Sequence, residues 1–190
     1  MKELPILAFE TQDAWANWLE EHHADSPGLW LRLAKKASGV TSIDYGQALE
    51  VALCYGWIDG QKKGYDDSSW LQKFTPRGPK SIWSKINREK AQQLIDSGRM
   101  RPAGMAAIER AQQDGRWEAA YDSQSNATVP DDLQAALDAN PEARAFFETL
   151  NSANRYAILF RIHTAKKTET RARRIEQFIA MLEQHEKLYP

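Results

Sequence analysis

The apolar pattern changes along this 190-residue chain, and that change limits the folds it can adopt. Residues 29–35 alternate, with Leu29, Leu31 and Leu33 on one face, as in a half-buried β-strand. From Pro130 onward, the apolar residues recur at helical spacing instead. Strands in the first part of a chain and helices alone in the last part are typical of the α+β class.

Turn and capping signals divide the chain into elements. Thr11, Ser42 and Ser84 are placed to cap the first three helices, and Gly56 and Gly98 follow the ends of the second and third. The expected elements are a helix over 11–23, a strand over 29–35, a helix between Ser42 and Gly56, a hairpin that pairs 57–58 and the residues after Gly60 with 69–74, a helix between Ser84 and Gly98, and helices over 102–115, 130–139, 141–150, 152–163 and 168–187.

We therefore predict an α+β fold, with a small antiparallel sheet packed by helices and a helical C-terminal module. The polar segment 122–130 lacks periodicity and is the best linker candidate. The expected boundaries are an α+β domain over 1–121, the linker over 122–130 and the helical module over 131–190. The module either forms a domain of its own or packs with the first domain as one body.

Composition argues against several classes of protein. A hydrophobic content of 42% with 27% charged residues is typical of a folded chain and not of a disordered one. No run approaches the roughly 18 apolar residues of a membrane span. The apolar stretch at the N-terminus is too short for a signal peptide. We therefore expect a cytoplasmic protein, and the single Cys54, which cannot form an internal disulfide, agrees with a reducing compartment.

The sequence lacks the common metal, nucleotide and nucleophile motifs. His22 and His23 are adjacent, so on a helix their side chains diverge by about 100° and cannot chelate one ion. Neither a G-x-G-x-x-G nor a Walker A pattern occurs, and there is no G-x-S-x-G elbow. Cys54 falls on the apolar face of a predicted helix. We expect no metal and no cofactor.

Positive charge is concentrated between two acidic segments. The whole chain has a formal charge of −1, but residues 61–101 carry +6, whereas 1–60 and 102–160 carry −5 each. Aromatic residues, a proline-rich loop and a helix start lie in or beside the basic segment. Such a surface attracts an anionic ligand or an acidic partner, or it pairs with its own acidic neighbours.

The first candidate site is the loop that Pro76 and Pro79 make rigid. Arg77 and Lys80 lie on this loop, which leads into the helix that begins near Ser84, and free N–H groups at a helix start favour an anion. A small molecule with a phosphate or carboxylate, or an acidic protein surface, would suit such a site. In the alternative interpretation the tryptophans are core, the serine is only a cap and the basic residues pair with acidic flanks. The predicted ligand-binding residues are Trp57, Asp59, Lys62, Arg77, Lys80, Ser81, Trp83, Ser84, Lys85, Asn87 and Arg88.

Asp59, in the motif G-W-I-D-G, is the second candidate. Its carboxylate either orients one of the cations or, in an enzyme, serves as a general acid or base toward a bound polar substrate. The competing interpretation is a turn aspartate that bonds backbone N–H groups. The sequence leaves open whether the protein is an enzyme.

The third candidate is the basic run 166–174, as a contact for nucleic-acid phosphates. On a helix, Lys167, Arg171 and Arg174 share one face. In the competing interpretation a threonine caps this helix and the arginines pair with acidic residues. Because the chain has a net charge of −1 and no base-reading element, nucleic acid is not an expected partner.

Four segments together resemble a known family. They are A-L-C-Y-G-W-I-D-G-Q at 52–61, F-T-P-R-G-P-K-S-I-W-S-K-I-N at 74–87, G-R-M-R-P-A-G at 98–104 and A-K-K-T-E-T-R-A-R-R-I at 165–175. Over nearly its whole length the chain resembles the YdeI/OmpD-associated family, whose members are often labelled bacteriocin-protection proteins. The resemblance implies a small α+β bacterial protein with no agreed reaction or accepted catalytic residues. It also implies a role in stress or antimicrobial-peptide tolerance, and sometimes a periplasmic address that the expected absence of a signal peptide does not match.

Overall fold

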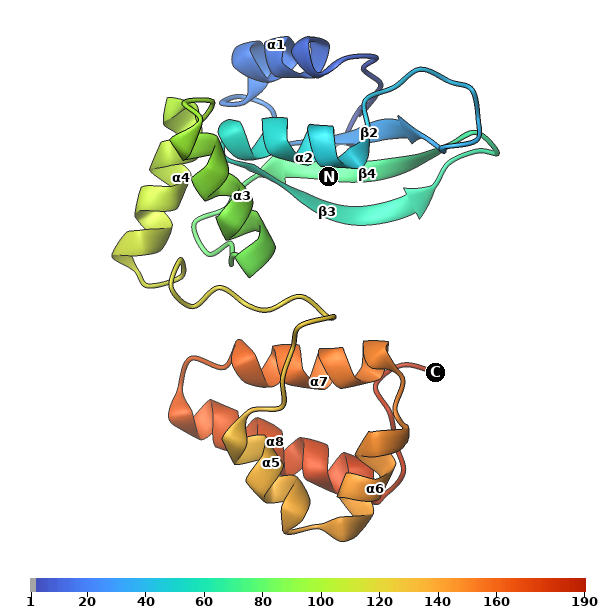
Figure 1. The fold of residues 1–190 in the computed structure, drawn as a ribbon, viewed down its shortest axis with the longest axis vertical. Helices are drawn as coiled ribbons and strands as arrows, with labels where there is room; N and C mark the ends of the chain where they lie inside the picture. Colours follow the sequence, from blue (N-terminus) through green and yellow to red (C-terminus); the bar gives the residue numbers. More distant parts are fainter. Residues whose placement is uncertain (1–2) are drawn as a thin grey trace. The chain divides into compact units, whose positions relative to one another are not determined.

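The computed structural model describes residues 3–190, and they divide into two compact units (Figure 1). Unit 1 ends at Ala120, and unit 2 comprises Tyr121–Pro190. Unit 1 contains β1 (Ile6–Leu7), α1 (Gln12–His22), β2 (Leu29–Ala34), α2 (Tyr45–Cys54), β3 (Trp57–Gly64), β4 (Ser69–Pro76), α3 (Lys85–Asp96) and α4 (Pro102–Gln113). Unit 2 contains α5 (Asp131–Asp138), α6 (Pro141–Thr149), α7 (Ser152–His163) and α8 (Thr168–Glu183).

The strands of unit 1 form one sheet with the order β1-β2-β4-β3. β4 pairs antiparallel with β2 and with β3, so that Leu31 lies opposite Gln72. The short β1 pairs in parallel with β2. The α+β class and the hairpin are confirmed. The parallel strand was not predicted, because two residues are too few to show an alternating pattern.

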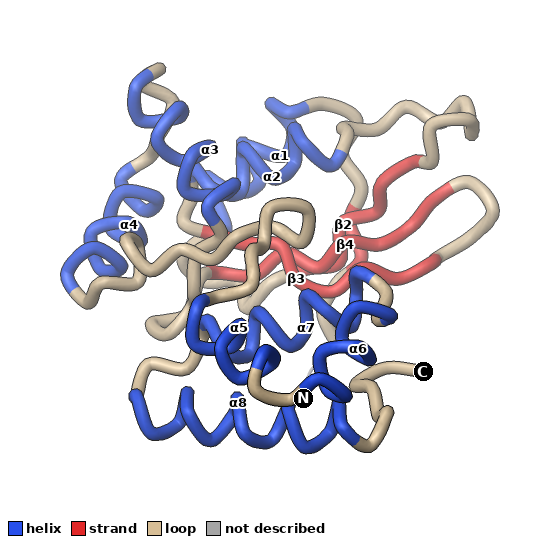
Figure 2. The backbone as a smooth tube through the Cα atoms, turned by 60° about the horizontal axis from the view of Figure 1, so that its bottom comes forward, coloured by secondary structure: helices blue, strands red, loops and turns tan. Residues whose placement is uncertain are grey.

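α1 and α2 cover one face of this sheet, as Figures 1 and 2 show. Leu29, Leu31 and Leu33 point into the core beneath these helices and expose at most 1% of their surface. Trp15 from α1 is fully buried there, and its indole N–H donates to the carbonyl of Ala48 at 3.1 Å. The alternation of leucines therefore identified the buried face of the sheet.

Two of the three predicted helix caps are confirmed. The Thr11 and Ser84 hydroxyls accept hydrogen bonds from backbone N–H groups three residues on, at 3.2 and 3.1 Å. The prediction for Ser42 is wrong, because Asp44 caps α2 through a capping box. The Ser42 hydroxyl instead accepts from the backbone N–H of Ala34 at 3.0 Å. It therefore completes the end of β2, a role that depends on the path of the following loop.

A close backbone approach joins α2 to α4. Gly56 has a φ of +72°, the left-handed conformation that commonly ends a helix. A Cβ at Gly104 would lie 2.4 Å from the carbonyl oxygen of Cys54 and 2.8 Å from that of Leu53. The backbone N–H of Arg101 donates to the same Cys54 carbonyl at 3.2 Å. The start of α4 thus faces the C-terminal carbonyls of α2, where the two helix dipoles attract each other.

Unit 2 is a helical bundle with its own hydrophobic core. The Asn154 side chain is buried and binds both the backbone N–H and the carbonyl of Tyr189, which fastens the C-terminal segment. Ala127 and Val129, from the segment expected as a linker, pack against this core. The fully buried residues of this core are Leu133, Ala143, Ile158, Ile162 and Leu182.

Candidate functional site

Arg77, the central residue of the predicted anion site, turns into the protein. It is 7% exposed, and its guanidinium carbon lies 3.5 Å from the centroid of the Trp83 ring. Its Nη1 donates to the carbonyl of Ile82 at 3.1 Å and to the Ser81 hydroxyl at 3.5 Å. Cation–π stacking and these bonds make Arg77 a brace inside the 77–84 loop.

The start of α3 is already occupied by its own side chains. Ser84 accepts from the backbone N–H of Asn87, which is itself 9% exposed. Arg88 donates from Nη1 to the carbonyl of Trp117 at 3.2 Å. These groups stabilise the helix start and its packing, which agrees with the structural interpretation of this segment.

Arg116 completes the same region and was not identified from the sequence. It is 7% exposed, and its Nε donates to both carboxylate oxygens of Asp114 at 2.7 Å. Its Nη1 donates to the carbonyl of Ser81 at 2.6 Å, and its Nη2 to that of Arg110 at 3.3 Å. The only local signal was the D-x-R spacing, and the partner at Ser81 lies 35 residues away.

Trp57 and Trp83, the two tryptophans among the predicted ligand-binding residues, belong to different aromatic groups. Trp57 lies edge-on to Trp15 and Trp18, with ring centroids 6.2 and 5.9 Å away. Trp83 packs edge-on to Trp117 at 4.8 Å. Trp57 and Trp83 expose 1% and 2% of their surfaces, so both are core side chains, as in the alternative interpretation.

Asp59 and Lys62 lie on β3 and not in a turn, because that strand begins at Trp57. The Asp59 carboxylate accepts from the Tyr45 hydroxyl at 2.8 Å, which links β3 to α2. Lys62 places its Nζ 4.1 Å from the centroid of the Trp70 ring. The turn interpretation of Asp59 is therefore wrong, and a role as acid or base stays a hypothesis.

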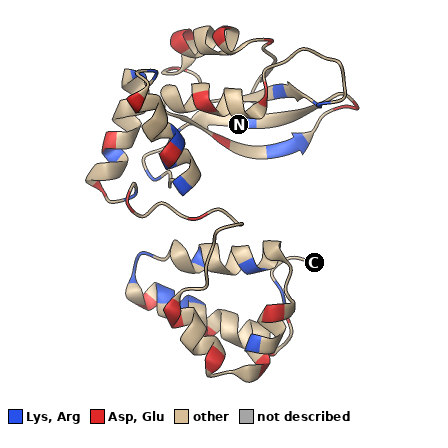
Figure 3. Cartoon of the chain, viewed as in Figure 1, with Lys and Arg blue, Asp and Glu red and all other residues tan. Residues whose placement is uncertain are grey.

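The basic residues of segment 61–101 are dispersed. Figure 3 shows Lys and Arg distributed over β3, α3 and the loop before it. Lys80 is exposed and Lys85 is half-buried. Ligand binding by these two residues stays a prediction, but the convergent site expected around them is not formed by Arg77, Trp57 and Lys62.

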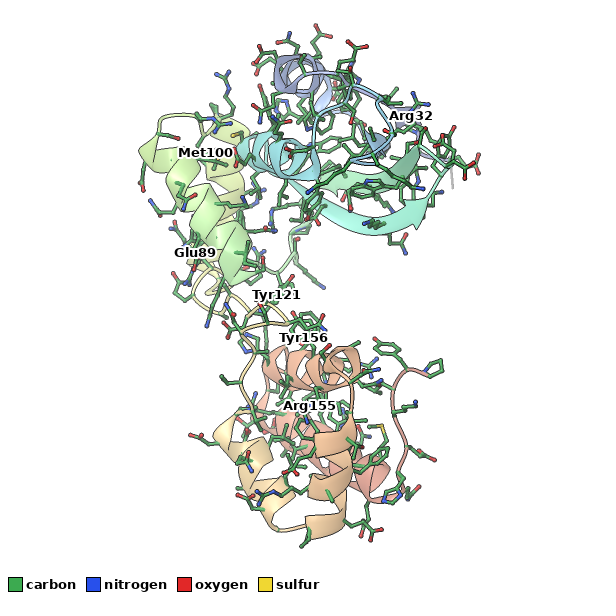
Figure 4. The ribbon with its side chains drawn as sticks, turned by 45° about the vertical axis from the view of Figure 1, so that its right-hand side comes forward. Arg32, Glu89, Met100, Tyr121, Arg155 and Tyr156 are labelled. Carbon is green, nitrogen blue, oxygen red and sulfur yellow. The ribbon has the colours of Figure 1, made fainter. Side chains whose placement is uncertain are left out.

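A cleft of about 320 Å³ lies elsewhere in unit 1, where α1, the end of α2 and the segment between α3 and α4 meet. Met100, labelled in Figure 4, belongs to this connecting segment. The charged residues that line the cleft are two arginines, Arg99 and Arg101, and one aspartate, Asp13. The lining residues are Gln12, Asp13, Ala16, Val51, Cys54, Tyr55, Gly98, Arg99 and Arg101.

Two arginines give the cleft its positive charge. Arg99 donates from Nη1 to a Glu50 oxygen at 3.1 Å, and Lys90 approaches the other oxygen at 3.8 Å. Arg101 stands at the N-cap of α4 with an extended backbone and no side-chain capping bond. Because Glu50 is shared between two cations, it neutralises only part of the charge beside the cleft.

Cys54 and Tyr55 contribute neutral groups to the same cleft. Burial raises the pKa of the Cys54 thiol, while the charges of Arg99 and Arg101 oppose that rise. The Tyr55 hydroxyl donates to Glu20 at 2.8 Å, and burial followed by this hydrogen bond raises its pKa, against the effect of Arg101. Both groups are therefore protonated at neutral pH, and the thiol is not an activated nucleophile.

The C-terminal basic stripe holds unit 2 together. Arg171 donates from Nε and Nη2 to the two oxygens of Asp132 at 2.5 and 2.8 Å. Arg174 donates from Nη1 to the carbonyl of Arg161. The predicted threonine cap is wrong, because Lys167 is the N-cap of α8 and makes no side-chain capping bond. The arginines thus fasten α8 to α5 and α7, as the structural interpretation proposed.

Within residues 3–190, no group of three or more His, Cys, Asp or Glu side chains is arranged to hold a metal ion. Along the same described range, no helix has both the length and the apolar character needed to cross a membrane.

The fold defines an α+β protein with a helical C-terminal unit. Residues 7–107 match the model of a family described as "Domain of unknown function (DUF8412)", and since this match spans more than half of the chain, the chain belongs to that family. Residues 126–185 match the model described as "Bacteriocin-protection, YdeI or OmpD-Associated". The resemblance is therefore confirmed for that part of the chain, whereas the motifs at 52–61, 74–87 and 98–104 lie inside the other match. No curated protein and no solved structure matches this chain.

Proposed function

We propose that the protein binds a small molecule with a carboxylate or phosphate group in the cleft of unit 1. The observation that carries this proposal is that Arg99 and Arg101 line one concave space of about 320 Å³. This volume falls within the range of small-molecule sites, which is roughly 300–1,000 Å³. The proposal keeps the class of ligand expected from the charge pattern and moves its site away from the 77–84 loop.

The lining suggests how such a ligand would be oriented. An arginine guanidinium presents a planar set of donors that matches a carboxylate or phosphate. Val51 and Cys54 add apolar surface to the lining, and Asp13 and Gln12 of α1 add acceptors. A ligand with an anionic group at one end and a hydrogen-bond donor at the other would therefore be preferred.

Isothermal titration with inorganic phosphate, nucleotides and dicarboxylates tests the proposal. We expect Arg101→Gln to weaken binding of the best ligand by tenfold or more, since charge-assisted hydrogen bonds contribute about 1.5–3 kcal/mol each. Lys80→Gln is the matched control, because it removes the same charge from an exposed position of the 77–84 loop. Equal losses in both variants, or no binding of any anion to the unaltered protein, would refute the cleft as the site.

A second candidate function is contact with an acidic protein surface through the second sheet face, defined by Trp30, Arg32, Lys63 and Lys73, with Leu71 buried between them. Strand pairing sets Arg32 and Lys63 on either side of Leu71, and Lys73 beside Trp30. These residues lie opposite the α1–α2 side because side chains alternate along a strand. Arg32 is labelled in Figure 4. An oligoglutamate peptide should bind at low salt and be lost in Arg32→Gln/Lys73→Gln; binding that ignores both changes would exclude this face.

The family description that matches residues 126–185 names bacteriocin protection. We extend this role in tolerance to the present chain as part of the proposal. A strain without the protein should then be more sensitive to a bacteriocin, and the Arg101→Gln variant should fail to restore tolerance. Full restoration by that variant would separate the cellular role from the cleft.

A further inference from the structure

Unit 2 contains a small hollow of about 130 Å³ beside α7. Three aromatic rings line it, those of Tyr121, Tyr156 and Phe160. The Tyr121 and Phe160 rings meet edge-to-face with centroids 5.0 Å apart, and the Tyr156 and Phe160 rings are tilted with centroids 5.9 Å apart. Figure 4 labels Tyr121 and Tyr156 at the same end of this unit. The other lining residues are Asp122, Ala127, Thr128, Pro130, Leu159, His163 and Arg171.

The size of the hollow limits its occupant. Sites for complete small molecules are typically about 300–1,000 Å³, and this hollow is well below that range. It has room for one head group or one side-chain end. Because three aromatic rings line so small a space, the occupant should be compact, with an apolar outline.

Arg171, the one arginine in the lining, has its charge engaged elsewhere. Its Nε and Nη2 donate to the two oxygens of Asp132, and its Nη1 donates to the carbonyl of Ile162 at 3.0 Å. The ion pair neutralises the guanidinium, and its planar donor edge already faces a carboxylate. An anion in the hollow would have to compete with Asp132 for it, so the hollow is not built for an anion.

The electrostatic environment at Tyr156 favours a cation in the hollow and not an anion. Its hydroxyl donates to the backbone carbonyl of Asp122 at 3.0 Å. The pKa of Tyr156 is raised, first by burial and then by Tyr121 and Asp122. The faces of the three rings are also regions of negative potential. Ring faces and a nearby carboxylate are the combination that favours a positive charge.

We propose that this hollow is an aromatic cage for a methylated ammonium group, as found on a small quaternary amine or a methylated lysine side chain. Such a group combines a compact apolar outline with a diffuse positive charge, and rings that surround it gain cation–π attraction without strong dehydration. Tyr121, Tyr156 and Phe160 form the cage, and Asp122 is the carboxylate in its lining. This site belongs to unit 2 and is separate from the anion cleft proposed in unit 1.

The test compares choline with 3,3-dimethylbutanol, which has the same shape with carbon in place of the charged nitrogen. Tyrosine and phenylalanine ring signals are followed by NMR in the full chain at pH 8. We expect choline to shift these ring signals with at least tenfold higher affinity than the neutral alcohol. Equal affinity of the two compounds would show that shape alone matters, and no shift by choline would show that the cage does not bind cations; either result overturns the proposal.

Two variants separate the cage from the fold. Tyr121→Leu should lose most of the choline affinity, while Tyr156→Phe keeps the ring and should retain binding within about threefold. If Tyr121→Leu fails to fold, Asp122→Asn replaces it, and we expect a several-fold loss for choline with no change for the alcohol. Undiminished choline binding in the variant that is used would refute the assignment of the site.

Discussion

The close approach of α4 to α2 makes Gly104→Ala an informative substitution. Alanine in place of glycine inside a helix normally stabilises a protein by about 1 kcal/mol. Here the added Cβ would lie 2.4 Å from the carbonyl oxygen of Cys54 and 2.8 Å from that of Leu53. Carbon–oxygen contacts normally begin near 3.3 Å, so α4 would have to retreat by about 1 Å. The sign of the effect should therefore be reversed.

Retreat of α4 would loosen the packing of Ala107 and Ile108, which are 5% and 1% exposed. Because backbone carbonyls block the position, overpacking here should cost about 2–3 kcal/mol, the upper part of the usual range, and the gain in helix propensity offsets about 1 kcal/mol of it. We expect a net loss of about 1–2 kcal/mol and a fall in Tm of roughly 3–8 °C. Most of this loss of stability should be independent of salt concentration, because the strain is steric and not electrostatic.

Urea denaturation followed by tryptophan fluorescence measures this effect, because all seven tryptophans lie in unit 1. Gly78→Ala is the control, since a Cβ there would meet no atom within 4 Å and should change stability by less than about 0.5 kcal/mol. A Gly104→Ala variant as stable as the unaltered protein would refute the argument that backbone carbonyls block this position.

Three further substitutions test other contacts. Asp44→Ala removes the capping box of α2 and should lower the free energy of unfolding of unit 1 by about 1 kcal/mol in the same urea assay. Arg171 holds the pKa of Asp132 below its usual 3.8, so the stabilisation is present above that pH and is lost as the pH falls further; Asp132→Asn should cost about 0.5–1 kcal/mol at pH 7 and little at pH 2–3, as measured by circular dichroism. Arg77→Met removes the guanidinium stacked on Trp83 and should destabilise unit 1 by about 1–3 kcal/mol without weakening anion binding, whereas a loss of binding alone would return Arg77 to the ligand site.

Features that depend on neighbouring residues were predictable from the sequence. The alternation around Leu31 identified a strand and its buried face, and Thr11 and Ser84 cap the helices that follow them. Ser42 was misassigned because its hydroxyl accepts from the backbone N–H of Ala34, eight residues earlier, and not from an N–H of the helix that follows. Arg116 was missed because its Nη1 donates to the carbonyl of Ser81, which lies 35 residues earlier in the sequence. Contacts between residues that are distant in the sequence leave no local sequence pattern from which they could be predicted.

The basic segment shows why a charge count does not locate a site. Lys62 and Lys63 are neighbours in β3, so the pleat sends them to opposite faces of the sheet. There they lie over different rings, Lys62 above Trp70 and Lys63 above Trp30, each with its Nζ 4.1 Å from the ring centroid. The net charge of +6 of this segment is therefore spread over several surfaces of the folded protein and does not form one binding site.

Arg99 and Arg101, in contrast, line the same cleft. They lie in the connection between α3 and α4 and not in a strand or a helix. Arg101 is held in place by its own backbone, whose N–H donates to Cys54 at the end of α2, so its side chain starts at the edge of the cleft. In a helix, residues two apart point to different surfaces. In a short connection beside a cleft, the side chains of Arg99 and Arg101 can both line the same space. If the anion proposal is correct, binding should therefore depend on the geometry of this junction, and Gly104→Ala should weaken anion affinity as well as stability; unchanged affinity in the folded variant would show that the arginines act independently of how α4 is docked.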